Sequence, residues 1–334
     1  MMLYLHGIGH FHPENVITNR FLEELEIGTD EAWILERVGI RERRTVLPLD
    51  YIRRTKNRDP RAAHEASLYT NAQTAAAAAR MALDRAGLGP ADIGMVVSGS
   101  CTPAHTTPVE AATVAAELGV DAPCLDVNSA CASFGMQIDF LGRMAPDRLP
   151  PFVLMVQPEN FTRSIDFSDR SSAILFGDGS TAAILSSSVK AAAAFVEAQS
   201  GTNAAAWGKV TIPPQGHFRQ DGHAVQGFAI RRMTESVRVL MKSAGEDNGH
   251  RGRFRFIGHQ ANLGALRTVC ERAKIPEEQH WFNVDRFGNT GCAGAPAVLS
   301  LHWDELAAGD RVGMAFVGAG LTWVHLLLTV EGDA

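Results

Sequence analysis

The segment 125–134, which reads Leu-Asp-Val-Asn-Ser-Ala-Cys-Ala-Ser-Phe, decides the fold and indicates the chemistry of this chain. An apolar run from Pro123 to Val127 has the pattern of a buried strand, and the stretch from Ser133 to Leu141 that of a helix. Cys131 therefore stands at a strand-to-helix turn, where the first N–H groups of the helix lack intrahelical partners. Those donors and the helix dipole favour a thiolate, so we expect a lowered pKa for Cys131 and an oxyanion site beside it. The competing interpretation is a buried structural cysteine, since free cysteine is among the most buried residue types.

The composition limits the class of protein. The 334 residues are enough for two domains or one duplicated one, and 46% hydrophobic and 20% charged residues are typical of a globular protein. A net charge of −6 disfavours nucleic-acid binding, and no apolar run is long enough to cross a membrane. No signal-peptide pattern is seen at Met1 to His10, and the five cysteines form no Cys-x-x-Cys pair. The sequence therefore predicts reduced thiols, a cytoplasmic location and no metal site.

Strand-like and helix-like segments alternate along the chain, which predicts an α/β fold with covered sheets. The two halves carry the same succession of features, because the strand ends Val97 and Ile257 are about as far apart in sequence as Cys131 and Asn289. Glycine turns at 177–179 and 318–320, each leading into a strand, form a third pair. We therefore predict a diverged repeat with halves 1–186 and 187–334. The expected strands are 3–8, 93–97, 123–127, 152–156, 181–185, 254–257, 281–284, 312–317 and 323–330, and the expected helices are 68–86, 108–118, 133–141 and 228–244.

Equivalent strand ends of a duplicated fold can meet at one site, and three such ends carry chemistry. The thiolate of Cys131 can accept an acyl group from a thioester. His259 and Asn289 can donate hydrogen bonds to the enolate oxygen of a second thioester, and a backbone N–H of the loop 318–320 can join the Cys131 N–H in an oxyanion hole. Considered singly, His259 is more often a polar core residue, and Asn289 beside Gly288 a turn residue.

Nearly the whole chain resembles the ketoacyl-acyl carrier protein synthase III enzymes of the thiolase superfamily. Each motif is weak alone, but together they occur in the order and near the spacing of that family. The resemblance implies a five-layered αβαβα thiolase fold, a homodimer and a condensing enzyme with no tightly bound cofactor. Its substrates would be carried on coenzyme A or on the phosphopantetheine of an acyl carrier protein. The motifs are Gly7-Ile8-Gly9, the run 33–43, Ser129 to Phe134, Asp169-Arg170, Phe176 to Gly179, His259 to Asn262, Gly288-Asn289-Thr290 and Gly318 to Trp323.

The resemblance also assigns roles to individual residues. It implies Cys131 as the acylated nucleophile, His259 and Asn289 as partners in decarboxylation and condensation, and the Ala319 loop as part of the oxyanion hole. Coenzyme A or pantetheine binding is expected at Trp33, Arg37, Arg170 and Asn262, and the acyl pocket at Thr107, Gln226 and Leu321.

Two of the pocket positions depart from the short-chain enzymes of this family. Thr107 stands where those enzymes place a phenylalanine that enters the partner subunit, and Gln226 replaces an aromatic. These changes predict a wider or more polar acyl pocket, which favours specialised metabolism such as polyketide synthesis.

Three alternatives stay open at this point. One is the same enzyme initiating fatty-acid synthesis, and another is an acyltransferase of the same fold that forms an ester or amide. The third is a non-catalytic subunit that supports an active ketosynthase. The presence of Asn289 favours carbon–carbon bond formation, and the presence of Cys131 argues against the non-catalytic subunit.

Overall fold

Nine strands form one continuous sheet in the computed structural model, which describes residues 2–214, 216–245 and 254–331. Their order is β11-β12-β13-β8-β1-β7-β6-β4-β5. The pairing of β1 with β8 joins only three residues on each strand, so the sheet divides there into two arms. The strands are β1 (Leu3–Phe11), β4 (Met95–Ser98), β5 (Cys124–Asp126), β6 (Val153–Glu159), β7 (Gly179–Ser186), β8 (Ala193–Thr202), β11 (Phe254–Gly258), β12 (Arg311–Gly318) and β13 (Thr322–Val330).

Two short hairpins and the helices complete the chain. The hairpins pair β2 (Asn15–Thr18) with β3 (Glu42–Thr45) and β9 (Val210–Thr211) with β10 (Arg219–Gln220). The helices are α1 (Asn19–Glu24), α2 (Glu31–Val38), α3 (Leu49–Thr55), α4 (Pro60–Ala66), α5 (Asn71–Ala86), α6 (Glu110–Leu118), α7 (Ser133–Gly142), α8 (Arg170–Ala173), α9 (Gly222–Ser243), α10 (Leu263–Ala273), α11 (Val284–Phe287) and α12 (Gly294–Leu301). Two of the 3-10 turns bear on the site, η3 (Phe161–Ser164) and η7 (Gly291–Ala293).

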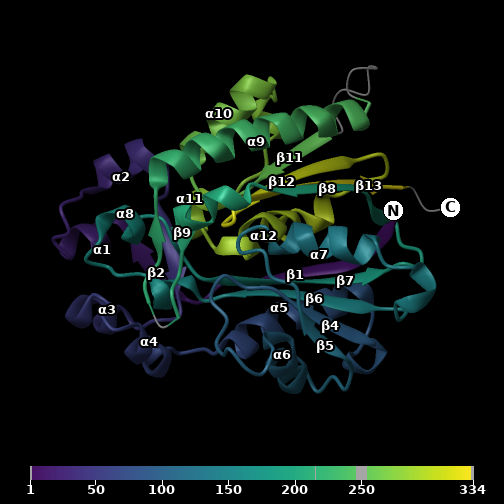
Figure 1. The fold of residues 1–334 in the computed structure, drawn as a ribbon, viewed down its shortest axis with the longest axis horizontal. Helices are drawn as coiled ribbons and strands as arrows, with labels where there is room; N and C mark the ends of the chain where they lie inside the picture. The colour runs from purple at the N-terminus through teal and green to yellow at the C-terminus, as the bar shows by residue number, and fades with distance from the viewer. Residues whose placement is uncertain (1, 215, 246–253, 332–334) are drawn as a thin grey trace.

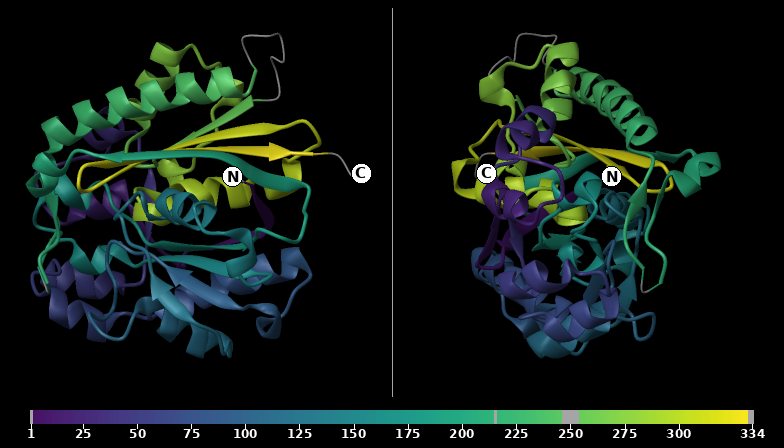
Figure 2. Two further views of the ribbon diagram at one scale, coloured as in Figure 1. Left: turned by 45° about the vertical axis from the view of Figure 1, so that its right-hand side comes forward. Right: turned by 90° about the vertical axis from the view of Figure 1, so that its left-hand side faces the viewer.

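The elements stack in five layers, as the family resemblance implied (Figures 1 and 2). α9 covers the outer face of the β8–β11 arm with α10 beside it, and α5 and α6 cover the outer face of the β1–β5 arm. α7 and α12 lie between the arms and contact strands of both. Among the described helices, none is both long and apolar enough to span a membrane.

The two arms repeat one strand order. Counted outward from the junction, the first arm reads β1-β7-β6-β4-β5 and the second β8-β13-β12-β11. The strands of each half can be numbered by their order in the sequence. Outward from the junction, each arm then begins with the first strand of its half, followed by the last, the second-last and the second strand. The predicted boundary at 186/187 falls between β7 and β8, and the duplication stays a prediction.

The alanine-rich sequence of α5 allows a very close approach to β1. Thr70 and Gln73 form a capping box at its start, and Gly87 ends it with a φ of 65°. A Cβ atom added to Gly7 or Gly9 of β1 would lie within about 2.2 Å of a carbonyl oxygen of α5. The glycines of the strand and the alanines of the helix are therefore one packing unit, which explains why both occur.

One expected strand is wrong. Residues 281–283 form no strand, the neighbouring His280 makes only an isolated bridge with Phe256, and Val284 begins the short helix α11. Gln260 explains the difference, because its Oε1 accepts from the N–H groups of Asn283 and Val284 at 3.0 and 3.2 Å. A side chain thus takes the place of a neighbouring strand. The other expected strands and helices are confirmed, with ends shifted by a few residues.

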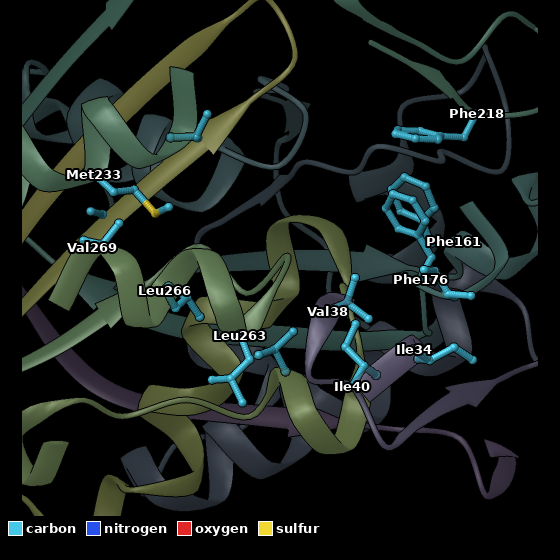
Figure 3. Close-up of a cluster of buried hydrophobic side chains, with 14 of the residues drawn as sticks. Ile34, Val38, Ile40, Phe161, Phe176, Phe218, Met233, Leu263, Leu266 and Val269 are labelled. Atoms are coloured by element: carbon cyan, nitrogen blue, oxygen red, sulfur yellow. The ribbon is translucent and has the colours of Figure 1, made fainter. Parts of the chain in front are cut away.

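A buried cluster connects the N-terminal helices to the second arm. Figure 3 shows Ile34 and Val38 of α2 near Leu263 and Leu266 of α10, and all four side chains belong to one hydrophobic core. Because Val38 also lines the cavity described next, this packing sets one wall of the site.

Candidate active site

Cys131 lies in the tight turn between β5 and α7, two residues before the helix begins. Asn128 fixes the turn, because its Nδ2 donates to the Ser100 carbonyl and its Oδ1 accepts from the Ala130 N–H, both at 2.8 Å. Ser133 closes it by donating to the Ala130 carbonyl at 2.6 Å. Ala130 has a φ of 49°, a left-handed conformation that costs roughly 1–3 kcal/mol outside glycine. The backbone that presents the thiol is therefore held in place by its own hydrogen bonds.

His259 directly follows β11 and is buried, with 8% of its surface exposed. The next residue, Gln260, anchors this loop by donating to the Gly258 carbonyl at 2.6 Å and accepting from Asn283 N at 3.0 Å. The His259 side chain lies close enough to the thiol of Cys131 to lower its pKa in part. The structure thus brings the predicted nucleophile and histidine together from the two arms.

Asn289 lies between α11 and η7 and is buried. Its backbone N–H donates to the Leu175 carbonyl at 2.8 Å, and its carbonyl accepts from Gly177 N at 3.1 Å, so its loop is fixed to the glycine turn of the first half. Its Oδ1 accepts from Gly291 N at 3.0 Å. This bond fixes the orientation of the amide and leaves Nδ2 as the donor available to a ligand.

A cavity of about 340 Å³ brings most of the predicted residues together. It is lined by residues of both arms and of α2, and it reaches from the thiol of Cys131 to Trp33 and Arg37 of α2. The predicted site residues that line it are Cys131, His259, Asn289, Ala319, Trp33, Arg37, Asn262 and Gln226.

Gly318 brings the end of β12 against the nucleophile turn. A Cβ atom on Gly318 would lie 2.8 Å from both the Ser129 carbonyl oxygen and the Ala132 nitrogen, so only a glycine allows this approach. Within the described part of the chain, the N–H groups of Cys131 and Ala319 donate to no other protein group. Two backbone donors thus remain for an oxyanion at this place.

The pKa of Cys131 is raised well above its ordinary value of 9.0, so the expectation of a lowered pKa is wrong. The hydrogen bond with Cys101 is the main cause, followed by burial, while His259 lowers the pKa of Cys131 only in part. The two sulfur atoms are 3.6 Å apart. The helix start still supplies its N–H groups, but a buried neighbouring thiol outweighs them. The resting thiol is therefore protonated, and a base must accept its proton during reaction.

Cys101 belongs to a row of buried groups that the sequence interpretation missed. Cys292 Sγ donates to Glu159 Oε1 at 2.9 Å, and the same carboxylate accepts from the Cys101 N–H at 3.0 Å. Burial raises the pKa of Glu159 and that of Cys292, the latter to about 12. A signal for Cys101 exists in the sequence: it follows β4 as Cys131 follows β5, and these adjacent parallel strands end at the same sheet edge.

The four residues expected to bind coenzyme A form one rim. The guanidinium groups of Arg37 and Arg170 lie over the Trp33 ring, 5.4 and 5.0 Å from its centre. Asn262 caps α10 by accepting from Ala265 N at 3.0 Å and donates to the Arg37 carbonyl at 3.3 Å. Two cations beside an aromatic face suit a ligand with a flat base and phosphates.

The expected acyl-pocket residues lie apart within one subunit, as the resemblance implies for Thr107, whose counterpart enters the partner subunit. Gln226 lines the cavity with Cys131, whereas Thr107 lines a separate, larger cavity. Leu321 is 3% exposed, packs in the core near Val317 and lines neither cavity. The backbone of Leu321 pairs with that of Asn203 through hydrogen bonds of 2.8 and 3.1 Å.

In the described ranges, no group of three or more His, Cys, Asp or Glu residues is arranged to hold a metal ion. The site offers a thiol, an imidazole, an amide and backbone donors that can act on a carbonyl compound.

Two segments match a known family. Residues 125–204 match 3-oxoacyl-[acyl-carrier-protein (ACP)] synthase III, and residues 254–330 match its C-terminal region. Among relatives, β-ketoacyl-[acyl-carrier-protein] synthase III of Roseiflexus sp. (strain RS-1) is 30% identical over 340 residues, covering 96% of each chain. The protein of the same name from Bacillus pumilus (strain SAFR-032) is 30% identical over 323 residues, covering 95% of each.

Solved structures agree with these matches. The crystal structure of 3-oxoacyl-[acyl-carrier-protein] synthase III from Aquifex aeolicus VF5 is 27% identical, with a TM-score of 0.85 over 98% of this chain and 99% of that one. The priming β-ketosynthase of the R1128 polyketide pathway is 26% identical, with a TM-score of 0.81 over 99% and 97%. The chain belongs to the β-ketoacyl-acyl carrier protein synthase III family and is a condensing enzyme of the acyltransferase class.

Proposed function

We propose that Cys131 accepts an acyl group from a thioester and that the enzyme joins this group to a second thioester by Claisen condensation. The observation that carries the proposal is one cavity lined by Cys131, His259, Asn289 and Ala319, in which the imidazole acts on the pKa of the thiol. No single arm of the fold supplies all four groups.

In the first half-reaction, His259 accepts the proton of Cys131 as the sulfur attacks the thioester carbonyl. The oxyanion of the tetrahedral intermediate binds the N–H groups of Cys131 and Ala319. The carrier thiolate then leaves and takes the proton from His259. One thioester is thereby exchanged for another, which explains why a protonated resting thiol suffices.

In the second half-reaction, a malonyl or β-keto thioester enters the emptied cavity. Loss of CO₂ from a malonyl group, or transfer of a proton from a β-keto group to water, leaves an enolate whose oxygen accepts from His259 Nε2 and Asn289 Nδ2. The enolate carbon attacks the acyl carbonyl on Cys131, the carbon–sulfur bond breaks, and the Cys131 thiolate takes a proton from water to restore the resting thiol. The Oδ1 bond to Gly291 supports the role of Asn289, because it turns Nδ2 into a fixed donor.

The carriers are proposed to be coenzyme A and the pantetheine of an acyl carrier protein, bound along Trp33, Arg37, Arg170 and Asn262. The acyl carrier protein appears in the names of the family and of the relatives. The polar Gln226 in the cavity favours specialised metabolism over fatty-acid initiation, and a polyketide priming ketosynthase is among the structures of similar fold.

A cytoplasmic homodimer is also proposed. β5 is an edge strand of the nine-stranded sheet, and an unpaired edge can pair with a second copy of the chain. Light scattering of the purified protein tests this, and a monomer at micromolar concentration would contradict it.

The mass of the intact protein after incubation with acyl thioesters tests the proposed chemistry. The panel contains short, long and functionalised acyl groups, each on coenzyme A and on a carrier protein. We expect an adduct on the natural enzyme, none on Cys131→Ala, and an undiminished adduct on Cys124→Ala, whose thiol lies on β5 and lines neither cavity.

Asn289→Ala separates the two half-reactions. It should still form the acyl adduct but lose most of the β-ketoacyl product when a malonyl thioester is added, because enolate stabilisation loses one donor. Full condensing activity in Cys131→Ala would overturn the proposal, and an ester or amide product would indicate the alternative acyltransferase.

A further inference from the structure

Glu159 is a buried carboxyl group that binds segments from both halves of the chain. It is the last residue of β6, and 0% of its surface is exposed. It lines neither the cavity of Cys131 nor the larger cavity of Thr107, so it is not placed to touch a substrate. A carboxyl group removed from water needs hydrogen-bond donors, and the donors around Glu159 show which segments it holds.

The first segment follows β4 and contacts the nucleophile turn. The N–H of Cys101 donates to both oxygens of Glu159, at 3.0 and 3.1 Å, and the Ser100 hydroxyl lies 3.3 Å from Oε2. The Ser100 carbonyl accepts from Asn128, the residue that fixes the turn of Cys131. The Cys101 sulfur is 3.6 Å from that of Cys131. Glu159 thereby holds the segment against which the nucleophile turn is fixed.

The second segment is η7, which begins two residues after Asn289. Cys292 donates to Glu159 Oε1 from its backbone N–H at 3.0 Å and from its Sγ at 2.9 Å. A Cβ atom added to Gly291 would lie 2.4 Å from Oε1, so the carboxyl group packs directly on this backbone. The N–H of Gly291 is also the donor that binds Asn289 Oδ1 at 3.0 Å. The carboxyl group therefore supports the bond that orients the Asn289 amide.

The two half-reactions make different demands on these segments. In the proposed condensation, the enolate held by Asn289 must bring its carbon to within about 3–3.5 Å of the acyl carbon on Cys131. Acylation uses the thiol, His259 and backbone N–H groups, and it does not need the Asn289 amide. A group that ties the Asn289 loop to the nucleophile turn should therefore matter more for condensation than for acylation.

We infer that Glu159 is a positioning residue for condensation, which fixes the Asn289 amide relative to the sulfur of Cys131. The inference rests on the roles proposed above for Cys131 and Asn289. Glu159 forms and breaks no covalent bond and exchanges no proton in either half-reaction. It acts only by holding two segments of the chain, far apart in sequence, at a fixed separation.

Shortening the side chain by one methylene tests the inference. In Glu159→Asp the carboxyl group keeps its charge, but it cannot reach both segments unless one of them moves. Each half-reaction is measured separately, acylation by intact mass and condensation by mixing the isolated acyl-enzyme with a malonyl thioester. We expect acylation to change by less than about threefold and condensation to slow by about 10- to 100-fold.

Glu110→Asp is the matched control, because Glu110 is another buried carboxyl group bound by N–H donors. Its Oε2 accepts from Ala104 N at 2.7 Å and from Asn71 Nδ2 at 2.8 Å. Neither partner belongs to the nucleophile turn or to the Asn289 loop. Glu110→Asp should therefore keep the natural ratio of the condensation rate to the acylation rate.

Glu159→Gln separates position from charge. The oxygen of the glutamine can accept from the N–H groups of Cys101 and Cys292. Its NH₂ group can donate to the Ser100 hydroxyl, whose own proton goes to the Pro158 carbonyl at 2.6 Å. Condensation should therefore stay within about fivefold of the natural rate and exceed that of Glu159→Asp. The reverse order would show that the charge matters rather than the position, and would overturn the inference.

A double-mutant cycle identifies the group through which Glu159 acts. In an Asn289→Ala background, Glu159→Asp should slow condensation further by less than about threefold, because the amide that Glu159 positions is absent. A further slowing as large as the one in the natural background would indicate a merely structural role for Glu159, and would overturn the inference.

Cys292→Ala keeps the test valid if Glu159→Asp prevents folding. It removes the Sγ donor and leaves the backbone N–H bond to Glu159 in place, so condensation should slow by about fivefold while acylation stays natural. Equal slowing of both half-reactions, or of neither, in the variant that folds would overturn the inference while upholding the proposed function. No adduct on Cys131 of the natural enzyme from any donor would overturn the proposed function itself.

Discussion

Replacing Gly318 by alanine tests whether the end of β12 positions the nucleophile. The new Cβ atom would stand 2.8 Å from Ser129 O and from Ala132 N, where ordinary contact begins at 3.4 Å, a deficit of 0.6 Å on both. These are backbone atoms, and the hydrogen bond from Ala132 N to Ser129 O at 3.1 Å holds them together. The turn that carries Cys131 must therefore move as a unit, because no flexible side chain can give way.

The expected cost of Gly318→Ala follows from that displacement. Overpacking of this kind costs ~1–3 kcal/mol of unfolding free energy. A shift of the reacting sulfur by a large part of an ångström should slow condensation by about 10- to 100-fold. Steady-state kcat/KM for β-ketoacyl formation and urea unfolding measure the two effects.

A glycine without neighbours provides the control for this substitution. Gly227 lies within α9, and nothing stands within 4 Å of its added Cβ atom. Gly227→Ala should therefore raise the stability by ~0.5–1 kcal/mol through helix propensity. Natural rate and stability in Gly318→Ala would refute the reasoning.

Two further predictions concern buried ionisable groups. Cys101→Ala should lower the pKa of Cys131, so that iodoacetamide labels Cys131 faster at neutral pH than in the natural protein. In the natural protein, the labelling rate of Cys131 should rise about tenfold per pH unit with no plateau below pH 9. A plateau of that rate near pH 7 would contradict the raised pKa. Asp178 is fully buried, and burial raises its pKa from 3.8 to about 6, so its contribution to stability is present below pH 3.8 and lost as the pH rises through 6. Urea titrations give the free energy of unfolding of the natural protein minus that of Asp178→Asn. This difference should fall by up to about 3 kcal/mol between pH 4 and pH 7. If the difference stays constant over that range, Asp178 keeps its ordinary pKa.

The raised pKa of Cys131 also bears on how its role is tested. Labelling by a thiol reagent at neutral pH is a natural assay for a nucleophilic cysteine, yet a protonated resting thiol reacts slowly even if it is catalytic. Acylation by a thioester is the better assay, because the substrate enters where His259 can accept the proton. The unreactive thiol is thus no argument for a non-catalytic subunit.

Local patterns allowed much of the fold to be predicted. The apolar run before Cys131 and the helix after it are β5 and α7, and the alanine-rich stretch after Thr70 is α5. Such elements depend on the periodicity of neighbouring residues, which a sequence displays directly. The strand expected at 281–284 failed because the side chain of Gln260, distant in sequence, binds the N–H groups that a strand would pair.

The sequence by itself determined the layered α/β fold, the family and the positions of Cys131, His259 and Asn289, because these follow from local pattern and motif order. Only the tertiary structure decided that Cys101 lies against the nucleophile and raises its pKa, and that Leu321 is buried in the core. It also decided that the buried Arg163 lines a second cavity. The physical reason is that a pKa and a cavity depend on distances through space between residues far apart in the chain, which no local pattern records.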